Sequence, residues 1–256
     1  MSLKQYIETL IEGDRHLTGD ETYNAFSVIL LENPPQCQVA SLLTLLRARR
    51  ESPEEISGMV RAMNAACQAV TFNDEKKLLD IVGTGGDGAD TINISTASVV
   101  LAAACGAIVA KAGNRSVSSC CGSADVLEAL GVQVDLSPSQ VVECVEQCGI
   151  AFLFAPINHP AMKAVAPIRK QLGVRTCFNI LGPMTNAASA QRAVIGVFQE
   201  DLMELVAETL KMVGRVDHVC VIHGGGLDEI SPMGPAKIIE VRRMQCPHLL
   251  LCNDSS

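Results

Sequence analysis

A glycine-rich segment holds the residues whose types and spacing point most clearly to chemistry. Residues 80–96 read Asp-Ile-Val-Gly-Thr-Gly-Gly-Asp-Gly-Ala-Asp-Thr-Ile-Asn-Ile-Ser-Thr, which is typical of a buried strand, a glycine turn and a helix start. Closely spaced glycines accept positive φ, so successive backbone N–H groups converge on an anion, and the helix N-terminus adds further donors. The spacing fits neither Gly-x-Gly-x-x-Gly nor a Walker loop. We predict a phosphate-binding turn; a plain connecting turn is the alternative.

A second polar block covers residues 111–119, with the sequence Lys-Ala-Gly-Asn-Arg-Ser-Val-Ser-Ser. It follows a predicted strand at 107–110, so it belongs to the same carboxyl edge of a parallel sheet as the glycine turn. Its two cations, one amide and three hydroxyls are suited to binding several oxygens of a polyphosphate. The alternative is a solvated basic loop.

Two adjacent carboxylates, Asp228 and Glu229, follow the predicted strand at 218–222. Carboxylate oxygens are the ligands that hydrated Mg²⁺ prefers. A solvated acidic pair is the alternative. With both polar loops on one sheet edge, the pattern favours Mg²⁺-dependent handling of a phosphorylated small molecule.

Alternating strands and helices must position these loops. Short apolar runs predict strands buried on both faces at 78–82, 107–110, 150–154, 193–198 and 218–222. Helical patterns lie between or after them, at 94–105, 123–130, 138–148, 160–172 and 201–213. This alternation predicts an α/β fold with a mainly parallel central sheet covered on both faces.

The first 70 residues predict helices alone. Thr18-Gly-Asp-Glu21 and Ser52-Pro-Glu-Glu55 have the spacing of capping boxes, and the second has a proline at the first helical position. We expect four helices that form a small helical domain over 1–70, followed by a large α/β domain over 71–256. The resemblance described below implies that the second domain is incomplete at its C-terminus.

Composition excludes several classes of partner. The chain has 256 residues, a net charge of -8 and only 3% aromatic residues, which disfavours nucleic-acid binding. The longest apolar stretch, 98–110, is too short to cross a bilayer, and no leader pattern starts the chain, so we expect a cytoplasmic protein without a membrane partner. An odd count of 11 cysteines favours reduced thiols with packing roles.

Many ordered motifs together resemble the anthranilate phosphoribosyltransferase family up to about residue 240. The motifs lie at 83–87, 93–96, 111–119, 122–131, 159–163, 169–176, 178–183 and 226–230. This resemblance implies a small helical domain hinged to a large α/β domain, with the segment near 165–190 packing against the helices. It also implies that phosphoribosyl pyrophosphate (PRPP) binds at the glycine-rich edge, that anthranilate binds at the domain interface, and that the N-terminal helices form a homodimer.

The resemblance assigns site residues by matching position. Anthranilate is expected at Gly83, Asn114 and Arg169, whose planar guanidinium suits a carboxylate. Mg²⁺ is expected at Ser95, Asp228 and Glu229. PRPP is expected at Gly83, Gly86, Asp87, Thr91, Asn93, Ile94, Ser95, Thr96, Lys111, Ala112, Gly113, Asn114, Arg115, Ser116, Val117, Ser118, Ser119 and Ser123.

The family reaction joins PRPP to the amine of anthranilate in tryptophan biosynthesis and releases pyrophosphate. Its chemistry is displacement at the anomeric carbon, with positioning and electrostatics dominant. An aniline nitrogen has a free lone pair at neutral pH, so no strong base is required. For His159 we weigh a general base against a hydrogen-bonded packing residue, and we assign it no catalytic role.

Two features depart from the family pattern. Ala112 stands where most relatives carry a histidine that lines the acceptor site, and the ending Met244–Ser256 does not resemble the expected continuation. We expect uncovered sheet edges and an uncovered apolar face, and a chain less stable than a full-length relative. Two alternatives remain: a non-catalytic relative that binds PRPP, and an enzyme similar to pyrimidine nucleoside phosphorylase.

Overall fold

The computed structural model describes residues 2–72, 76–86, 88–89, 91–116 and 121–243. The N-terminal helices are α1 (Lys4–Glu12), α2 (Gly19–Leu31), α3 (Gln36–Arg49) and α4 (Pro53–Ala65). Both predicted capping boxes are confirmed: Thr18 with Glu21 at the start of α2, and Ser52 with Glu55 at the start of α4. Local hydrogen bonds therefore fix where two of the four helices begin.

The following part alternates strands with helices and contains a six-stranded sheet in the described residues. The strands are β1 (Leu78–Gly83), β2 (Ile108–Gly113), β3 (Ile150–Phe154), β4 (Arg192–Gly196), β5 (His218–Gly224) and β6 (Ala236–Arg242). The helices are α5 (Ile94–Ala104), α6 (Ser123–Ala129), α7 (Pro138–Cys148), α8 (Ala155–Asn158), α9 (Met162–Leu172), α10 (Phe178–Leu181) and α11 (Leu202–Val213), with a 3₁₀ turn η1 (Gly182–Met184). The predicted α/β class is confirmed.

The strand order is β3-β2-β1-β4-β5-β6, and β1 to β5 pair in parallel. The edge strand β6, which we did not predict from the sequence, pairs antiparallel with β5. From β1 the chain runs outward through β2 and β3, then returns to β4 on the other side of β1. The order therefore reverses between β1 and β4, and the crevice beyond their carboxyl ends is where open α/β sheets bind ligands.

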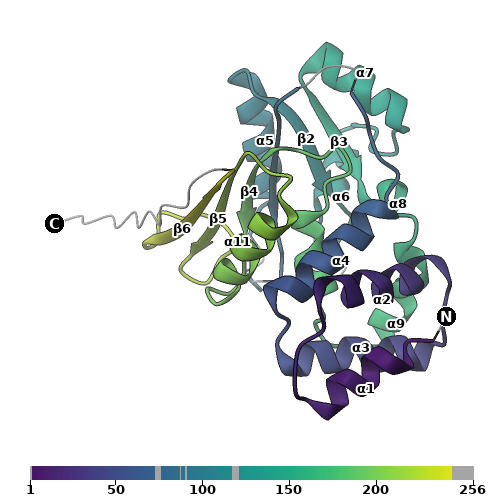
Figure 1. Cartoon of the computed structure of the whole chain (residues 1–256). Helices are drawn as coiled ribbons and strands as arrows, with labels where there is room; N and C mark the ends of the chain where they lie inside the picture. The colour runs from purple at the N-terminus through teal and green to yellow at the C-terminus, as the bar shows by residue number, and fades with distance from the viewer. Residues whose placement is uncertain (1, 73–75, 87, 90, 117–120, 244–256) are drawn as a thin grey trace.

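One apolar core joins the helical part to the sheet. It contains side chains from α1 to α4, from α9 to α11 and from β4, β5 and β6. The Phe26 and Phe178 rings meet with centroids 5.5 Å apart, so the segment after α9 packs into the helical part. Figure 1 shows α4 and α11 at this junction, where they contact each other.

Part of the α/β surface is apolar and exposed. On α5, Val100 is 55% exposed and Leu101 is 66% exposed. Among the described helices, none combines the length and apolar character that a membrane span requires.

Candidate active site

The glycine turn after β1 lies against the carboxylate of Asp228. Gly85 and Gly86 have φ values of +65° and +80°, which favour glycine. The Gly85 N–H donates to Asp228 Oδ2 at 2.7 Å. A methyl group at Gly83 would lie 2.3 Å from the same oxygen. The structure therefore brings the predicted metal ligand Asp228 directly to the predicted phosphate turn.

Two glycines at the reversal point make room for Asp228. Gly83 ends β1, Gly196 ends β4, and the two residues are paired in register. A Cβ atom at Gly196 would lie 1.7 Å from the Asp228 carbonyl oxygen. Asp228 is itself only 8% exposed. Any larger residue at either strand end would displace this carboxylate.

Lys111 carries a buried ammonium group to the same edge. Its Nζ donates to the Ile81 carbonyl at 2.6 Å and lies 3.3 Å from Ser95 Oγ, in the first turn of α5. Burial lowers the pKa of Lys111, while Asp80 and Glu229 act in the opposite direction. Lys111 thus links the predicted metal ligands Ser95 and Glu229, one by a hydrogen bond and the other electrostatically.

Asp80 is a polar residue of this region that our sequence reasoning left without a role. Its carboxylate is 2% exposed and accepts hydrogen bonds from Asn186 Nδ2 at 2.7 Å and from the Ala112 N–H at 3.2 Å. Burial raises the pKa of Asp80, opposed first by Lys111 and then by the bond from Asn186. The sequence did contain a signal for Asp80: it is a carboxylate within an apolar run predicted to be buried on both faces. A buried carboxylate requires a hydrogen-bonding or charged partner.

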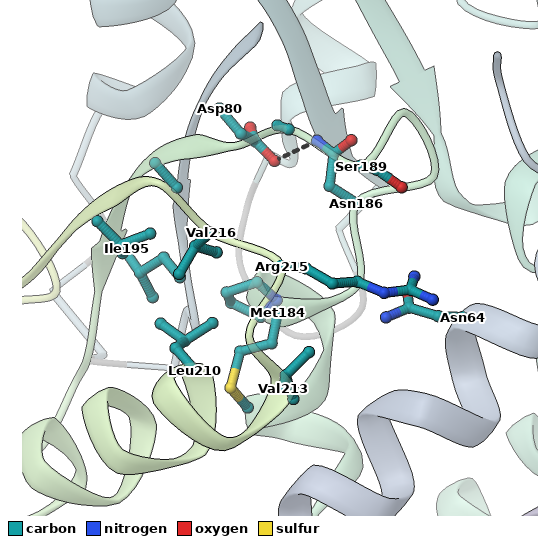
Figure 2. Close-up of a pocket in the computed structure, with 14 residues that line it drawn as sticks. Asn64, Asp80, Met184, Asn186, Ser189, Ile195, Leu210, Val213, Arg215 and Val216 are labelled. Carbon is teal, nitrogen blue, oxygen red and sulfur yellow. Dashed lines mark hydrogen bonds between the residues drawn. The ribbon is translucent and has the colours of Figure 1, made fainter. Parts of the chain in front are cut away.

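Figure 2 shows Asp80 and Asn186 joined at the margin of a small cavity of about 40 Å³. Its walls come mainly from α4, α11, β4 and the segment around η1. The glycine turn does not line it. We therefore treat the cavity as a packing defect at the junction rather than as the donor site.

The loop after β2 is tied to α6. Asn114 Oδ1 accepts the Arg115 N–H at 2.8 Å, and the Ser123 hydroxyl bonds the Asn114 backbone. The Arg115 guanidinium pairs with Glu128 at 2.5 Å. Asp125 Oδ2 accepts the Ser116 N–H and the Gly122 N–H, each at 2.8 Å. The loop therefore has fixed ends.

Arg115 departs from the simple expectation of a phosphate-binding side chain. Its guanidinium is engaged by Glu128, and it lies over the Phe154 ring at 4.6 Å from the centroid. In this structure its charge is directed to α6.

The remaining residues predicted to bind PRPP lie around the start of α5. Asn93 precedes the helix, and its Nδ2 donates to the Cys121 carbonyl at 3.2 Å, which joins the two polar loops. Ile94 is the first helical residue and Thr91 is exposed. Thr96 Oγ1 is buried without a hydrogen-bond partner. Asp87, Val117, Ser118 and Ser119 lie outside the described residues, as does the ending 244–256.

The three residues predicted to bind anthranilate lie at the sheet edge and on α9. Gly83 and Asn114 lie at or just beyond the carboxyl ends of the neighbouring strands β1 and β2. Arg169 lies on α9, which packs on α2 and α3, and its guanidinium is 5.5 Å from the Phe178 centroid. Burial lowers the pKa of Arg169.

His159 has a packing environment. Its Nε2 lies 2.9 Å from the Thr185 carbonyl, and its Nδ1 is buried without a partner. Burial lowers the pKa of the ring, which keeps it neutral. These contacts support leaving His159 without a catalytic role.

The structure adds Arg175, which we had quoted in a motif but left without a role. It lies between α9 and α10, donates from Nη2 to the Gly86 carbonyl, and covers the Phe198 ring at 4.1 Å from the centroid. No local sequence pattern indicates this role, because Arg175 meets the glycine-rich turn only in the folded chain.

A separate polar cluster lies on β5 and β6. His218, Cys220 and Glu240 place three ligand atoms within 4.8 Å of one another. Arg242 also donates twice to the Glu240 oxygen that bonds His218. A guanidinium already neutralises this carboxylate, so we interpret the cluster as an ion network.

Family comparisons agree with this architecture. Residues 4–67 match the helical bundle domain of a glycosyl transferase family, and residues 75–253 match its a/b domain. The chain is 47% identical to an anthranilate phosphoribosyltransferase of Methanosarcina acetivorans, covering 94% of this chain and 64% of that protein. It is 46% identical to that of Roseiflexus sp., covering 96% of this chain and 72% of that protein. The chain thus spans about two thirds of these relatives.

Solved structures give the same result. The anthranilate phosphoribosyltransferase of Thermus thermophilus superposes with a TM-score of 0.86 at 44% identity, covering 92% of this chain and 70% of that one. The enzyme of Saccharomyces cerevisiae in complex with PRPP and Mg superposes with a TM-score of 0.85 at 30% identity, covering 92% and 69%. With both family domains matched in order, this chain belongs to the anthranilate phosphoribosyltransferase family.

Proposed function

We propose that this protein transfers the phosphoribosyl group of PRPP to the amine of anthranilate and releases pyrophosphate, as a step of tryptophan biosynthesis. The observation that carries the proposal is the contact between the Asp228 carboxylate and the Gly85 N–H. It joins an acidic segment to an anion-binding turn at the point where the strand order reverses. The relatives' names and the yeast complex with PRPP and Mg support the choice of substrates.

The donor site combines backbone donors with one buried cation. The glycine turn and the first turn of α5 present N–H groups at the carboxyl edge of the sheet, where a phosphate is stabilised by the helix dipole. The Lys111 ammonium lies beside this helix start, at Ser95. We infer that these groups, together with the loop from Ala112 to Ser116, bind the phosphates and ribose of PRPP.

The acidic residues fit Mg²⁺. Ser95, Asp228 and Glu229 offer only oxygen ligands, and Lys111 links Ser95 with Glu229. The glycine at 83 leaves the space that the Asp228 carboxylate occupies. These three residues would hold Mg²⁺, which when bound neutralises charge on the diphosphate as it departs. Asp228 also holds the glycine turn through the Gly85 N–H.

The acceptor is positioned rather than activated. Arg169 on α9 would provide a guanidinium for the anthranilate carboxylate, and Gly83 and Asn114, at the carboxyl ends of β1 and β2, would contact the same molecule. The aniline lone pair needs no base before it attacks the anomeric carbon. As the C–N bond forms, the C–O bond to pyrophosphate breaks, and the nitrogen, now positively charged, releases a proton to water. Catalysis then rests on holding the amine opposite the departing pyrophosphate.

The test follows anthranilate fluorescence with PRPP and Mg²⁺ present. We expect fluorescence loss with the wild type and at least a hundredfold slower loss with Asp228→Asn, since a metal ligand and a turn contact are both weakened (~3 kcal/mol). Asp201→Asn, an exposed aspartate preceding α11, is the matched control and should retain wild-type rates. PRPP binding without turnover would instead favour the non-catalytic alternative.

We also propose a cytoplasmic homodimer that forms through the N-terminal helices. Ile11 on α1 is 66% exposed and Leu31 on α2 is 69% exposed, which supports an apolar contact there. Light scattering on the eluting protein measures the mass. A monomeric mass at micromolar concentration would contradict the dimer.

A further inference from the structure

We propose that Arg175 is a positioning residue of the donor site, which holds the glycine turn in its anion-binding shape. This inference rests on the proposed function, because it concerns the same turn. Arg175 belongs to the short link between α9 and α10, outside every segment assigned to PRPP above. Its guanidinium donates to the Gly86 carbonyl.

The glycine turn needs contacts from outside because it has no side chains of its own at its centre. Gly85 and Gly86 both have positive φ, a pair of conformations that free glycines leave readily. In the described part of the turn, one side chain binds each residue: Asp228 accepts the Gly85 N–H, and Arg175 donates to the Gly86 carbonyl. A carboxylate and a guanidinium thus hold the turn on both sides of the peptide unit that joins Gly85 to Gly86.

The position of Arg175 is itself fixed by stacking. Its Cζ lies 4.1 Å from the centroid of Phe198, which follows β4. The Phe198 N–H donates to Thr84 Oγ1 at 3.1 Å, and the Thr84 N–H donates to the Gly196 carbonyl at 2.9 Å. The turn after β1, the turn after β4 and the link after α9 are therefore connected through one guanidinium.

The guanidinium also limits the backbone at residue 86. A Cβ atom at Gly86 would lie 3.1 Å from Arg175 Nη2 and 3.3 Å from its Cζ. With the Gly85 N–H and the Gly86 carbonyl both held, the planar peptide unit between these two glycines can rotate little, which limits the direction of the Gly86 N–H. Arg175 therefore orients a backbone donor without having to touch the ligand, which defines a positioning residue rather than a catalytic one.

Calorimetric titration of PRPP with Mg²⁺ into the full chain tests the proposal. We expect the PRPP dissociation constant to rise about tenfold in Arg175→Ala, the loss typical of one charge-assisted hydrogen bond. Arg175→Lys should recover little, because lysine keeps the charge but not the planar fork. Arg192→Ala, an exposed arginine at the opposite end of the sheet, should bind as the wild type does.

A second measurement separates positioning from general stability. The unfolding temperature without ligand and the anthranilate affinity should stay at wild-type values in Arg175→Ala. A merely structural role would lower the unfolding temperature, the anthranilate affinity and the PRPP affinity together. If Arg175→Ala does not fold, Phe198→Leu removes the stacking surface and should weaken PRPP about threefold.

Two outcomes are distinguishable. PRPP affinity that is unchanged in Arg175→Ala, or in Phe198→Leu where that variant replaces it, overturns this inference and leaves the proposed function intact. A wild-type chain that binds no PRPP overturns both.

Discussion

The Gly85 N–H donates to Asp228 Oδ2 at 2.7 Å, although 143 positions separate the two residues in the chain. This bond exists because β1 and β4 both end in glycine, which leaves space for the carboxylate between them. A carboxylate at this reversal point thus lies against the turn that we propose binds the phosphates of PRPP.

Gly83→Ala should weaken PRPP binding in the presence of Mg²⁺. The new methyl group would lie 2.3 Å from Asp228 Oδ2, so the carboxylate must move. We expect a loss of about 1–3 kcal/mol in PRPP binding, measured by calorimetry. Gly182→Ala is the matched control, because a Cβ there meets nothing within 4 Å. Equal losses in both variants would contradict the role of the space at Gly83.

Alkaline pH should weaken PRPP binding through Lys111. Burial lowers the pKa of this lysine, so as pH rises Lys111 loses its charge at a lower pH than an ordinary lysine does. The charged group costs stability at neutral pH, and that cost is relieved as pH rises through its folded-state pKa toward the ordinary lysine value of 10.5. Binding should therefore fall while unfolding stability does not.

This pH profile is measured by calorimetry between about pH 8 and 10, below the ordinary lysine pKa. Lys170, an exposed lysine on α9, gives the matched control variant Lys170→Ala, which should keep the wild-type profile. A wild-type affinity that stays constant to pH 10 would show that Lys111 does not bind the donor through its charge.

Acid should reduce the stability of the helical part through Glu21. Its carboxylate pairs with Arg15 at 2.6 Å and completes the capping box of α2, which lowers its pKa to about 2. A lowered carboxyl pKa contributes stability that is present above the ordinary glutamate value of 4.5 and is lost as pH falls toward about 2. The Glu21→Gln variant should show a smaller loss of unfolding temperature across this range.

The comparison for Glu21 uses Glu146→Gln, an exposed glutamate on α7. Thermal unfolding of wild type and both variants is followed from about pH 5 to pH 2. Identical acid sensitivity in wild type and Glu21→Gln would mean that this contact is not formed in solution.

Phe178→Leu should weaken anthranilate binding as well as stability. The ring packs on Phe26 at 5.5 Å and lies under the Arg169 guanidinium at the same distance. We expect about 1–2 kcal/mol of lost stability from the altered packing, by denaturant unfolding. Phe26→Leu should cost similar stability but retain anthranilate affinity, because the Arg169 guanidinium lies over the Phe178 ring. Equal anthranilate affinities in Phe178→Leu and Phe26→Leu would exclude a role for the Phe178 ring in placing Arg169.

Ala112→His should strengthen anthranilate binding. Ala112 follows Lys111 on β2, and its N–H is held by Asp80 at 3.2 Å, so the strand position is fixed. The family pattern has a histidine here that lines the acceptor site, so we expect the added ring to contact anthranilate. Anthranilate affinity should rise about threefold by calorimetry, an effect of under about 1 kcal/mol. Weaker binding would mean that the site has adapted to the smaller residue.

Local patterns in the sequence determined most of the elements. The capping boxes Thr18–Glu21 and Ser52–Glu55 set helix starts within a single turn, and apolar runs marked five of the six strands. The strand β6 was missed because it is an edge strand with exposed charges, which weakens the apolar pattern. The glycine turn was recognisable because glycine's freedom at positive φ is a local property.

Only the tertiary structure decided which partners these residues meet. Arg115 carries a charge suited to phosphate, yet Glu128 on α6 takes it. Arg175 reaches the Gly86 carbonyl across 89 positions, and Asp80 finds Asn186 across 106. Such pairs depend on how strands order themselves in the sheet and on which helix covers them. Those choices follow from burying apolar faces across the whole chain, and no short window of sequence contains them.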